Sequence, residues 1–360
     1  MIFVITGATH GLGLHCARSL SSSGDAEHIL LACRDVAAAR ALAIPRSVVL
    51  DVPLDLTSLE SVRAYAGALR AWLGTRRINA LVNNAGVGGR AGLTPMLTAD
   101  GFERIWQTNH LGHFLLTLLL LPVLAEGARI TNVASEVHDA HAQRIPMMVD
   151  PGTSFPEDDE EWESRVARGA PMPGESAMES GSRRYSRSKL CNILFTHELA
   201  RRLSGACARG CPEDVAAALP AGGRCSLPHA GSITAIAFNP GAMMDGNFVL
   251  SIGGPIAAAV AYGCLPLLRV LPSVARLLRS AAESGPVLAR IAAPVPAPDA
   301  WTAAYYDGPT LQLTSAFSRS REAVTRHQLD LWRLSVGWAQ VTDKELREAG
   351  VDAGPRVVSL

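Results

Sequence analysis

Apolar runs and amphipathic patterns alternate along the first 135 positions of the chain. The strand-like runs, rich in aliphatic and β-branched residues, stand at 2–5, 28–33, 48–54, 78–82 and 129–134. Patterns with the helical period lie between them, at 12–22, 35–43, 58–73 and 101–125. A sixth apolar run, 233–238, follows a periodic helix at 184–203. Strands separated by single helices form βαβ units, so the pattern predicts an α/β fold with a doubly wound parallel sheet.

Two segments interrupt this alternation, and we expect them to be insertions in a single domain that spans 1–360. Residues 138–182 and 204–231 lack periodicity and are rich in small residues and proline. The first of them carries the acidic run 157–161, which predicts a solvated face rather than a metal or partner site.

The last third of the chain predicts a lid and a packed helical segment. The uncharged stretch 249–268 is broken by Gly and Pro, which favours a substrate lid over 242–295 rather than a spanning helix. Peripheral contact with a membrane is the alternative for this stretch. Residues 317–348 are helical in pattern, and their apolar stripe predicts packing against the domain.

Composition narrows the class of protein. The chain has 360 residues with 33 Lys+Arg and 33 Asp+Glu, so it is formally neutral and has no basic field to hold nucleic acid. A hydrophobic content of 48% with 18% charged residues excludes general disorder. Seven irregularly spaced cysteines predict neither a disulfide framework nor a metal site. The chain opens on a strand-like run without a secretion signal, which predicts a cytoplasmic protein.

Glycines cluster where the first strand is expected to end, in the pattern T-G-x-x-x-G-x-G over 6–13. Glycine lets the backbone turn sharply and approach a pyrophosphate, whose charge the N-terminus of the next helix attracts. A strand before the pattern and a helix after it predict a Rossmann-type dinucleotide site, with a tight turn lacking ligand as the alternative. The predicted cofactor contacts are Gly7, Thr9, His10, Gly11, Leu12 and Gly13.

The next two strand ends carry candidate contacts for the adenosine half of the cofactor. Arg34 can pair with a 2′-phosphate and stack on adenine, which favours NADPH. Asp35 would instead hold the 2′-hydroxyl of NADH and repel a phosphate. We favour Arg34, which lies nearer the strand end, over Asp35. Asp55, followed by Leu56, is placed to accept a hydrogen bond from the adenine amino group; capping the helix that begins near Ser58 is its alternative role.

The fourth strand ends in Asn83-Asn84-Ala85-Gly86. Side-chain amides there can tie neighbouring strand ends together, and Gly86 leaves room for the cofactor. Asn84, Ala85 and Gly86 are therefore candidate cofactor contacts, although the same four residues also form a common turn signal.

A tyrosine and a lysine lie four residues apart on one helical face, Tyr185 and Lys189. A fixed ammonium favours the phenolate and lowers the tyrosine pKa, so the pair predicts an acid–base group. The same ammonium can hold the ribose hydroxyls of a nicotinamide nucleotide. The chain contains only two lysines, so a compact ammonium at this position is itself a signal against a merely solvated pair.

Two polar residues complete the candidate catalytic set. Ser135 ends the fifth strand and can donate a hydrogen bond to a substrate oxygen. Asn109 lies inside a predicted helix, where asparagine is unfavourable. A helix kink with a water site beside Lys189 is its functional interpretation, and a satisfied core polar group is the alternative.

Taken together, TGATHGLG, NNAG, NHLG, Ser135, YSRSK and Asn239-Pro240-Gly241 resemble the short-chain dehydrogenases/reductases over about residues 1–245. LACRD, TNHLGHFLLT and SKLCNILFTHELARRL are similar to the branch that holds retinol dehydrogenases and light-dependent protochlorophyllide reductases. The resemblance implies that Tyr185 donates the proton, Lys189 assists it, Ser135 polarises the substrate and Asn109 holds a relay water. It also implies cofactor contacts at Pro240 and Gly241, a substrate contact at Cys191, and a homodimer through 101–125 and 184–203.

The sequence therefore predicts an NADPH-dependent oxidoreductase, with NADH the less favoured cofactor, that transfers hydride between nicotinamide and a bulky apolar carbonyl or alcohol. A light-dependent double-bond reductase of the protochlorophyllide type is the alternative within the enzymes. A non-catalytic NADPH-binding redox sensor is the alternative from another class.

Overall fold

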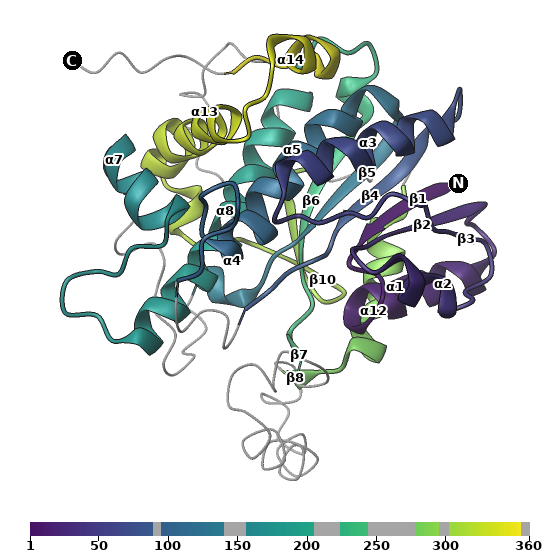
Figure 1. The fold of residues 1–360 in the computed structure, drawn as a ribbon, viewed down its shortest axis with the longest axis horizontal. Coiled ribbons are helices and arrows are strands. Elements are labelled where there is room, and N and C mark those ends of the chain that lie inside the picture. The colour runs from purple at the N-terminus through teal and green to yellow at the C-terminus, as the bar shows by residue number, and fades with distance from the viewer. Residues whose placement is uncertain (89–94, 140–155, 205–223, 244–277, 295–301, 354–360) are drawn as a thin grey trace.

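The computed structural model describes residues 1–88, 95–139, 156–204, 224–243, 278–294 and 302–353. An eight-stranded sheet runs in the order β10-β9-β6-β5-β4-β1-β2-β3 (Figure 1). Its strands are β1 (Ile2–Thr6), β2 (His28–Ala32), β3 (Ser47–Val48), β4 (Ile78–Asn83), β5 (Leu124–Val133), β6 (Thr234–Asn239), β9 (Ala304–Asp307) and β10 (Thr310–Gln312). Every neighbouring pair is parallel except β9 with β10. The doubly wound parallel sheet is confirmed.

Helices cover both faces of the sheet, as Figure 1 shows. One layer holds α1 (Gly11–Ser23), α2 (Val36–Ala41) and α12 (Ala281–Ala292), and the other holds α3 (Leu59–Leu73), α5 (Gly112–Leu120) and α8 (Ala177–Ser204). The two layers follow from the alternation of side chains along β1. Phe3 and Ile5 are buried in the core on the α1 side, whereas Ile2 and Val4 are buried in the core on the α3 side.

Part of the predicted lid is a framework helix. Within 242–295, β7 (Ala242–Met243) pairs with β8 (Leu278–Arg279), and α12 packs tightly along α1. A Cβ atom on Gly285 would lie 2.3 Å from the Cβ of His15, so only glycine permits this approach. The prediction of a lid over 242–295 is therefore wrong for residues 281–292, because these residues complete the core beside α1. Residues 249–268 lie outside the described part of the chain.

The predicted helix at 101–125 is divided into pieces. It consists of α4 (Arg104–Trp106), a π-helical turn over Gln107–Leu111 and α5, followed by a short 3₁₀ turn over Leu121–Val123. A π turn inserts one extra residue and turns the helix face, and such turns are common at functional sites. Asn109 lies in this turn.

Residues 156–182 of the predicted insertion contain helical elements that the sequence pattern did not indicate. The acidic run begins α7 (Asp159–Glu161), whose N-cap Asp158 accepts a hydrogen bond from the backbone N–H of Glu161. A π-helical turn over Trp162–Ala167 follows, and it buries Trp162 and Val166. Helix α8 already begins at Ala177. Residues 140–155, and 205–223 in the other insertion, lie outside the described residues.

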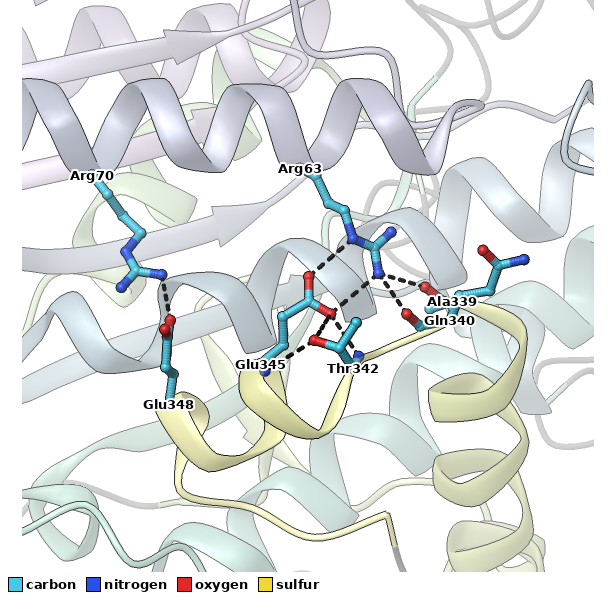
Figure 2. A network of polar contacts seen from close by, with 7 residues as sticks. All are labelled: Arg63, Arg70, Ala339, Gln340, Thr342, Glu345 and Glu348. Atoms are coloured by element: carbon cyan, nitrogen blue, oxygen red, sulfur yellow. Dashed lines mark hydrogen bonds and ion pairs between the residues drawn. The ribbon is translucent and has the colours of Figure 1, made fainter.

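The C-terminal segment packs as predicted, but on the surface that we expected to form a dimer. Its main helices, α13 (Gln328–Trp338) and α14 (Asp343–Ala349), lie over α8 and α5 (Figure 1). Figure 2 shows how α14 is attached to α3: Arg63 Nε lies 2.9 Å from Glu345 Oε1, and Arg63 also donates to the carbonyl of Ala339. Helices α13 and α14 thus cover part of the surface that the expected homodimer through α5 and α8 would use, and the homodimer itself stays a prediction.

Candidate active site

The glycine loop and the NNAG segment meet at the point where the strand order reverses, between β1 and β4. Gly7 has φ +66°, and a Cβ on it would lie 2.9 Å from the Cα of Ala85. A Cβ on Gly13 would lie 2.6 Å from the side-chain nitrogen of Asn84. The amide of Asn84 donates to the carbonyl of Thr6 at 2.8 Å. This is the position where doubly wound sheets bind ligands, outside the carboxyl ends of the strands.

The N-terminus of α1 is open toward this loop. Its N-cap residue, His10, makes no side-chain cap and instead contacts the hydroxyl of Thr9, and no acidic residue lies in the first turn. The unpaired backbone N–H groups and the helix dipole there favour an anion. Gly11 has φ +54°, and a Cβ on it would meet no heavy atom within 4 Å, so space remains beside the loop. The side chain of Leu12 is buried in the core, which leaves only its backbone for a ligand.

The two candidates at the end of β2 have different tasks. Asp35 is the N-cap of α2, and its side chain accepts from the backbone N–H of Ala38 at 2.8 Å. Arg34 is exposed and has no ion pair or hydrogen bond with any residue that the structure describes. A free cation beside an occupied carboxylate favours a phosphate-bearing ligand.

Asp55 does not cap α3. Ser58 is the N-cap, and its side chain accepts from the backbone N–H of Ser61. Asp55 instead accepts from the backbone and hydroxyl of Thr57, at 2.9 and 2.7 Å, in a local turn. Leu56 is buried against Gly112, where a Cβ would lie 2.7 Å from the Leu56 carbonyl. A ligand could therefore contact Leu56 only through its backbone.

The amides of the NNAG segment tie the strand ends together, as the sequence predicts. Asn83 donates to the side-chain oxygen of Asn132 at 2.8 Å and to the hydroxyl of Thr117 at 3.0 Å. Asn132 in turn donates to the hydroxyl of Thr196 on α8, at 2.9 Å. Strands β4 and β5 and helices α5 and α8 are thereby fixed relative to one another.

Two residues that the sequence analysis missed, Thr6 and His113, link the glycine loop to the π turn. His113 Nδ1 lies 3.1 Å from the carbonyl oxygen of Asn109, and Nε2 lies 2.9 Å from the hydroxyl of Thr6. Burial lowers the pKa of His113 to about 4, so its ring is neutral. A threonine at the end of a strand gives no sequence signal that separates this role from packing.

Asn109 connects three elements at the edge of the sheet. Its side chain accepts from the backbone N–H of Val87 at 2.8 Å and donates to the hydroxyl of Ser188 at 2.9 Å. A Cβ on Gly86 would lie 3.3 Å from Asn109 Oδ1 and 3.6 Å from Lys189 Nζ. Gly86 thus leaves an open space in front of the ammonium, while Asn109 fixes the end of β4 to α8.

Tyr185, Ser135 and Lys189 come together at the carboxyl end of β5. A hydrogen bond joins the side chains of Ser135 and Tyr185. Lys189 Nζ lies 5.8 Å from the centroid of the Tyr185 ring and donates to the carbonyl of Val133 at 3.0 Å. The structure thus brings these three residues together, and their catalytic roles stay predictions.

The pKa of Tyr185 shifts in the direction opposite to the expected one. Burial raises the pKa of Tyr185 to about 12, because desolvation outweighs the hydrogen bond from Ser135, which lowers it. The expected lowering by Lys189 is not found in the chain alone. Burial also lowers the pKa of Lys189 to about 8, which leaves the ammonium mostly charged at neutral pH.

Pro240 and Gly241 follow β6 at the same edge of the sheet. The side-chain oxygen of Asn239 accepts from the backbone N–H of Gly241 at 3.0 Å, and Ser284 of α12 donates to the carbonyl of Pro240 at 2.7 Å. These bonds fix a loop that faces the ends of β5 and β6. Its position is compatible with the predicted cofactor contacts.

Cys191 does not lie where a substrate could reach it. Its side chain is fully buried in the core of the α3 side, and burial raises its pKa to about 12. The prediction of a substrate contact at Cys191 is therefore wrong. The residue faces inward from α8. Helical spacing alone does not show which face of a helix is turned toward the core.

A doubly wound sheet with a glycine loop at its reversal point defines a Rossmann-type nucleotide-binding fold. Residues 1–147 match the model of the short chain dehydrogenase family. This part of the chain is thus similar to the short-chain dehydrogenases/reductases.

Individual relatives show the same similarity. Human retinol dehydrogenase 12 is 39% identical over 213 residues, which covers 57% of this chain and 57% of that protein. Chloroplastic protochlorophyllide reductase from Chlamydomonas reinhardtii is 47% identical over 122 residues, or 33% of this chain and 30% of that protein. The match thus spans little more than half the length of the retinol dehydrogenase and less than a third of the Chlamydomonas enzyme. An uncharacterized protein from Mycobacterium paratuberculosis has a similar solved structure, with a TM-score of 0.56 and 27% identity over 94% of this chain and 93% of that chain.

The described residues contain neither a membrane-spanning helix nor a metal-binding cluster. No helix among them is long and apolar enough to cross a membrane. No group of three or more His, Cys, Asp or Glu side chains in the described ranges could hold a metal ion.

Proposed function

We propose that this protein is an NADPH-dependent oxidoreductase that transfers hydride between nicotinamide and a bulky apolar carbonyl or alcohol, such as a retinal-like aldehyde or a ketone. The observation that carries the proposal is the meeting of Tyr185, Ser135 and Lys189 in front of Gly86, at the sheet edge that also holds the glycine loop. The similarity to retinol dehydrogenase 12 supports the class of substrate.

The residues present fit a nicotinamide dinucleotide. The uncapped N-terminus of α1 would hold the pyrophosphate, and the exposed Arg34 would pair with a 2′-phosphate. Lys189 would bind ribose hydroxyls in the space that Gly86 leaves open. The cofactor, when bound, supplies or accepts the hydride.

The proton is handled by the chain itself. Ser135 would orient the substrate oxygen with its hydroxyl, beside the phenol to which it is bonded. Tyr185 keeps its proton at neutral pH because burial raises its pKa to about 12, so it can donate that proton to the oxygen formed on reduction. The charged Lys189 nearby would then stabilise the phenolate left behind. In the oxidative direction, the phenolate would take the hydroxyl proton.

The test is a turnover assay that follows NADPH consumption with retinal, long-chain aldehydes and aromatic ketones, in the dark and under visible light. Tyr185→Phe should lower the rate by about 10²–10⁴-fold and keep NADPH binding. Tyr306→Phe, in strand β9, is the matched control and should keep the rate. Equal activity in Tyr185→Phe and the wild type would contradict the proposal.

The same assay separates the alternatives. Turnover only under light would favour the light-dependent double-bond reductase, for which the similarity to the Chlamydomonas enzyme is the supporting observation. Tight NADPH binding without turnover of any carbonyl would favour the redox sensor. The cytoplasmic location stays a prediction.

A further inference from the structure

A buried carboxyl group lies next to the proposed catalytic set and has no part in the mechanism above. Glu136 follows Ser135 directly and begins the 3₁₀ turn Glu136–Asp139. Its residue surface is only 5% exposed. Glu136 is the chain neighbour of Ser135, whose side chain is hydrogen-bonded to the phenol of Tyr185, and a negative charge on Glu136 raises the pKa of that phenol. This relationship joins a titratable group to the proton donor.

The carboxyl belongs to a cluster built from three strand ends. Asn239, at the end of β6, is hydrogen-bonded to Glu136 and donates to Asp307 Oδ1 at 3.1 Å. Arg279 of β8 lies 2.9 Å from that same oxygen of Asp307. The side-chain amide of Asn239 therefore bonds to the carboxyl groups of both Glu136 and Asp307. Arg279 contacts Asp307, the more exposed of the two.

Among the described residues, the charged and polar groups around Glu136 can be named. The groups are Tyr185 from α8, Asn239 as hydrogen-bond donor from β6, Tyr305 and Asp307 from β9, Arg279 from β8, and His138 and Asp139 from its own turn. Burial is the largest influence on the Glu136 carboxyl, and Asp307 adds to it. Arg279 and Asn239 act in the opposite direction, and the resulting pKa of Glu136 is about 7. The charge beside Tyr185 therefore changes near neutral pH.

We propose that Glu136 is a positioning residue that acts through Tyr185: the buried negative charge formed when its carboxyl loses a proton opposes removal of the proton from the Tyr185 phenol. The inference rests on the proposed function. Carbonyl reduction needs Tyr185 in its phenol form, whereas alcohol oxidation needs the phenolate to take the hydroxyl proton of the substrate while hydride passes from its carbon to the oxidised nicotinamide. Ionised Glu136 thus restrains oxidation above neutral pH and keeps the proton donor loaded for reduction.

Glu136→Gln separates charge from structure, because the amide oxygen can still accept the hydrogen bond from Asn239. The measurement is kcat/KM for alcohol oxidation from about pH 5.5 to about pH 9, as the ratio of variant to wild type. We expect a ratio near one at the acid end, where wild-type Glu136 carries its proton, and a rise of several-fold, up to about ten-fold, above about pH 8. A ratio that is flat across this range, or a loss of activity by one factor at every pH, would overturn the proposal.

Two further variants sharpen the pH profile. Glu163→Gln changes an exposed carboxyl that is paired with Arg168, far along the chain from the cluster, and should give a flat ratio near one. Asp307→Asn removes the charge that raises the pKa of Glu136, so the neutral transition should move to lower pH. A transition that stays in place in Asp307→Asn would contradict the role of this cluster.

A measurement without turnover distinguishes failure of this inference from failure of the proposed function. Tyrosinate absorbance is followed from about pH 8 to about pH 11 in the wild type and Glu136→Gln, each minus its own Tyr185→Phe counterpart. The Tyr185 signal should begin at lower pH in Glu136→Gln. The same onset in both proteins overturns the inference even if carbonyls are reduced. An earlier onset without any turnover upholds the coupling and refutes the proposed function.

Discussion

The hydroxyl of Thr6 donates a hydrogen bond to Nε2 of His113, at 2.9 Å, in the buried interior between β1 and α5. The same oxygen accepts from the backbone N–H groups of Asn84 and Ala85, both at 2.9 Å. A hydroxyl has one proton to donate and two lone pairs, so all of its hydrogen-bonding capacity is used. One side chain thereby sets the distance between the glycine loop and the NNAG segment.

Replacing this hydroxyl should weaken both the fold and the cofactor site. Thr6→Val keeps the shape of the side chain but leaves two backbone donors and one imidazole without their partner. We expect a loss of about 1–3 kcal/mol in the free energy of unfolding, measured with urea, and weaker NADPH binding, measured by fluorescence. Thr6→Ser keeps the hydroxyl and should stay close to the wild type. A Thr6→Val protein as stable as Thr6→Ser would show that the hydroxyl is not needed.

Cofactor preference should depend on Arg34. Arg34→Ala removes the exposed cation at the end of β2 and should weaken NADPH binding by about ten- to hundred-fold, with little change for NADH. Arg40→Ala, which removes a neighbouring arginine paired with Asp51, is the matched control. Fluorescence titration with both nucleotides gives the two affinities. Preference for NADH in the wild type would transfer the role to Asp35, despite its capping bond to Ala38.

The buried ammonium of Lys189 should lower the free energy of unfolding of the protein at neutral pH. Its pKa of about 8 in the folded protein lies below the usual value near 10.4, so burial of the ammonium is unfavourable at neutral pH. Val133 keeps a donor without it, because Asn192 also bonds to that carbonyl, at 3.2 Å. Lys189→Met should therefore lose turnover while gaining about 1–3 kcal/mol of unfolding free energy at pH 7.

The stability difference between Lys189→Met and the wild type should decrease as the pH rises. Above about pH 8 the folded wild type binds fewer protons than the unfolded chain, so its stability rises relative to Lys189→Met up to about pH 10.4. Urea unfolding of both proteins over this range measures the difference. A Lys189→Met protein that is less stable than the wild type at pH 7 would mean that the ammonium is stabilised by its surroundings.

Sequence pattern was sufficient for the elements whose period is long and regular. The βαβ repeat and the glycine loop are local signals, so β1, α1 and the reversal point could be predicted from them. Strands β9 and β10 were missed because they are three to four residues long and follow a stretch without periodicity. The π turn around Asn109 was missed because it differs from an α-helix by one inserted residue.

The chemistry of the site was predictable only in part. Tyr185 and Lys189 are four apart on one helix, so their shared face follows from helical geometry. The cluster around Glu136 joins residues from β6, β8 and β9, and no spacing in the sequence brings these together. Burial also determines the direction of each pKa shift here, and burial depends on the completed packing.

The ion pairs in Figure 2 provide a comparison between a half-buried and a more exposed pair on the same two helices. The side chains of Arg63 and Glu345 are 31% and 17% exposed, and those of Arg70 and Glu348 are 38% and 35% exposed. Arg63 Nη2 also donates to backbone carbonyls at the end of α13, which the second arginine does not do within the described residues.

Double-mutant cycles on the two pairs should give different coupling energies. We expect about 1 kcal/mol or more between Arg63 and Glu345, and less than about 0.5 kcal/mol between Arg70 and Glu348, because water screens the exposed pair. The Arg63 side chain lowers the pKa of Glu345, so the first coupling should be present at neutral pH and be lost as the pH falls through the carboxyl pKa. Equal couplings in urea unfolding would contradict the dependence on burial.

Trp332 of α13 lies between the C-terminal segment and helices α5 and α8. Its indole packs against Phe114 of α5 and Phe195 of α8, with ring centroids 5.2 and 6.2 Å away. The guanidinium of Arg202 lies 4.0 Å from the centroid of the Trp332 ring. The indole N–H of Trp332 donates to the carbonyl of Asp352 at 3.0 Å. The side chain is fully buried and contacts both helices.

Removing this side chain should therefore cause two changes. Trp332→Ala should lower the free energy of unfolding by about 3–5 kcal/mol, because it leaves a large cavity. It should also expose apolar surface over Phe114 and Phe195, so that sedimentation velocity detects concentration-dependent association that the wild type does not show through this face. Trp332→Phe fills most of the space and should restore the wild-type sedimentation, although it lacks the bond to Asp352. Association of the wild type that is unchanged in Trp332→Ala would mean that copies of the chain meet through a different surface.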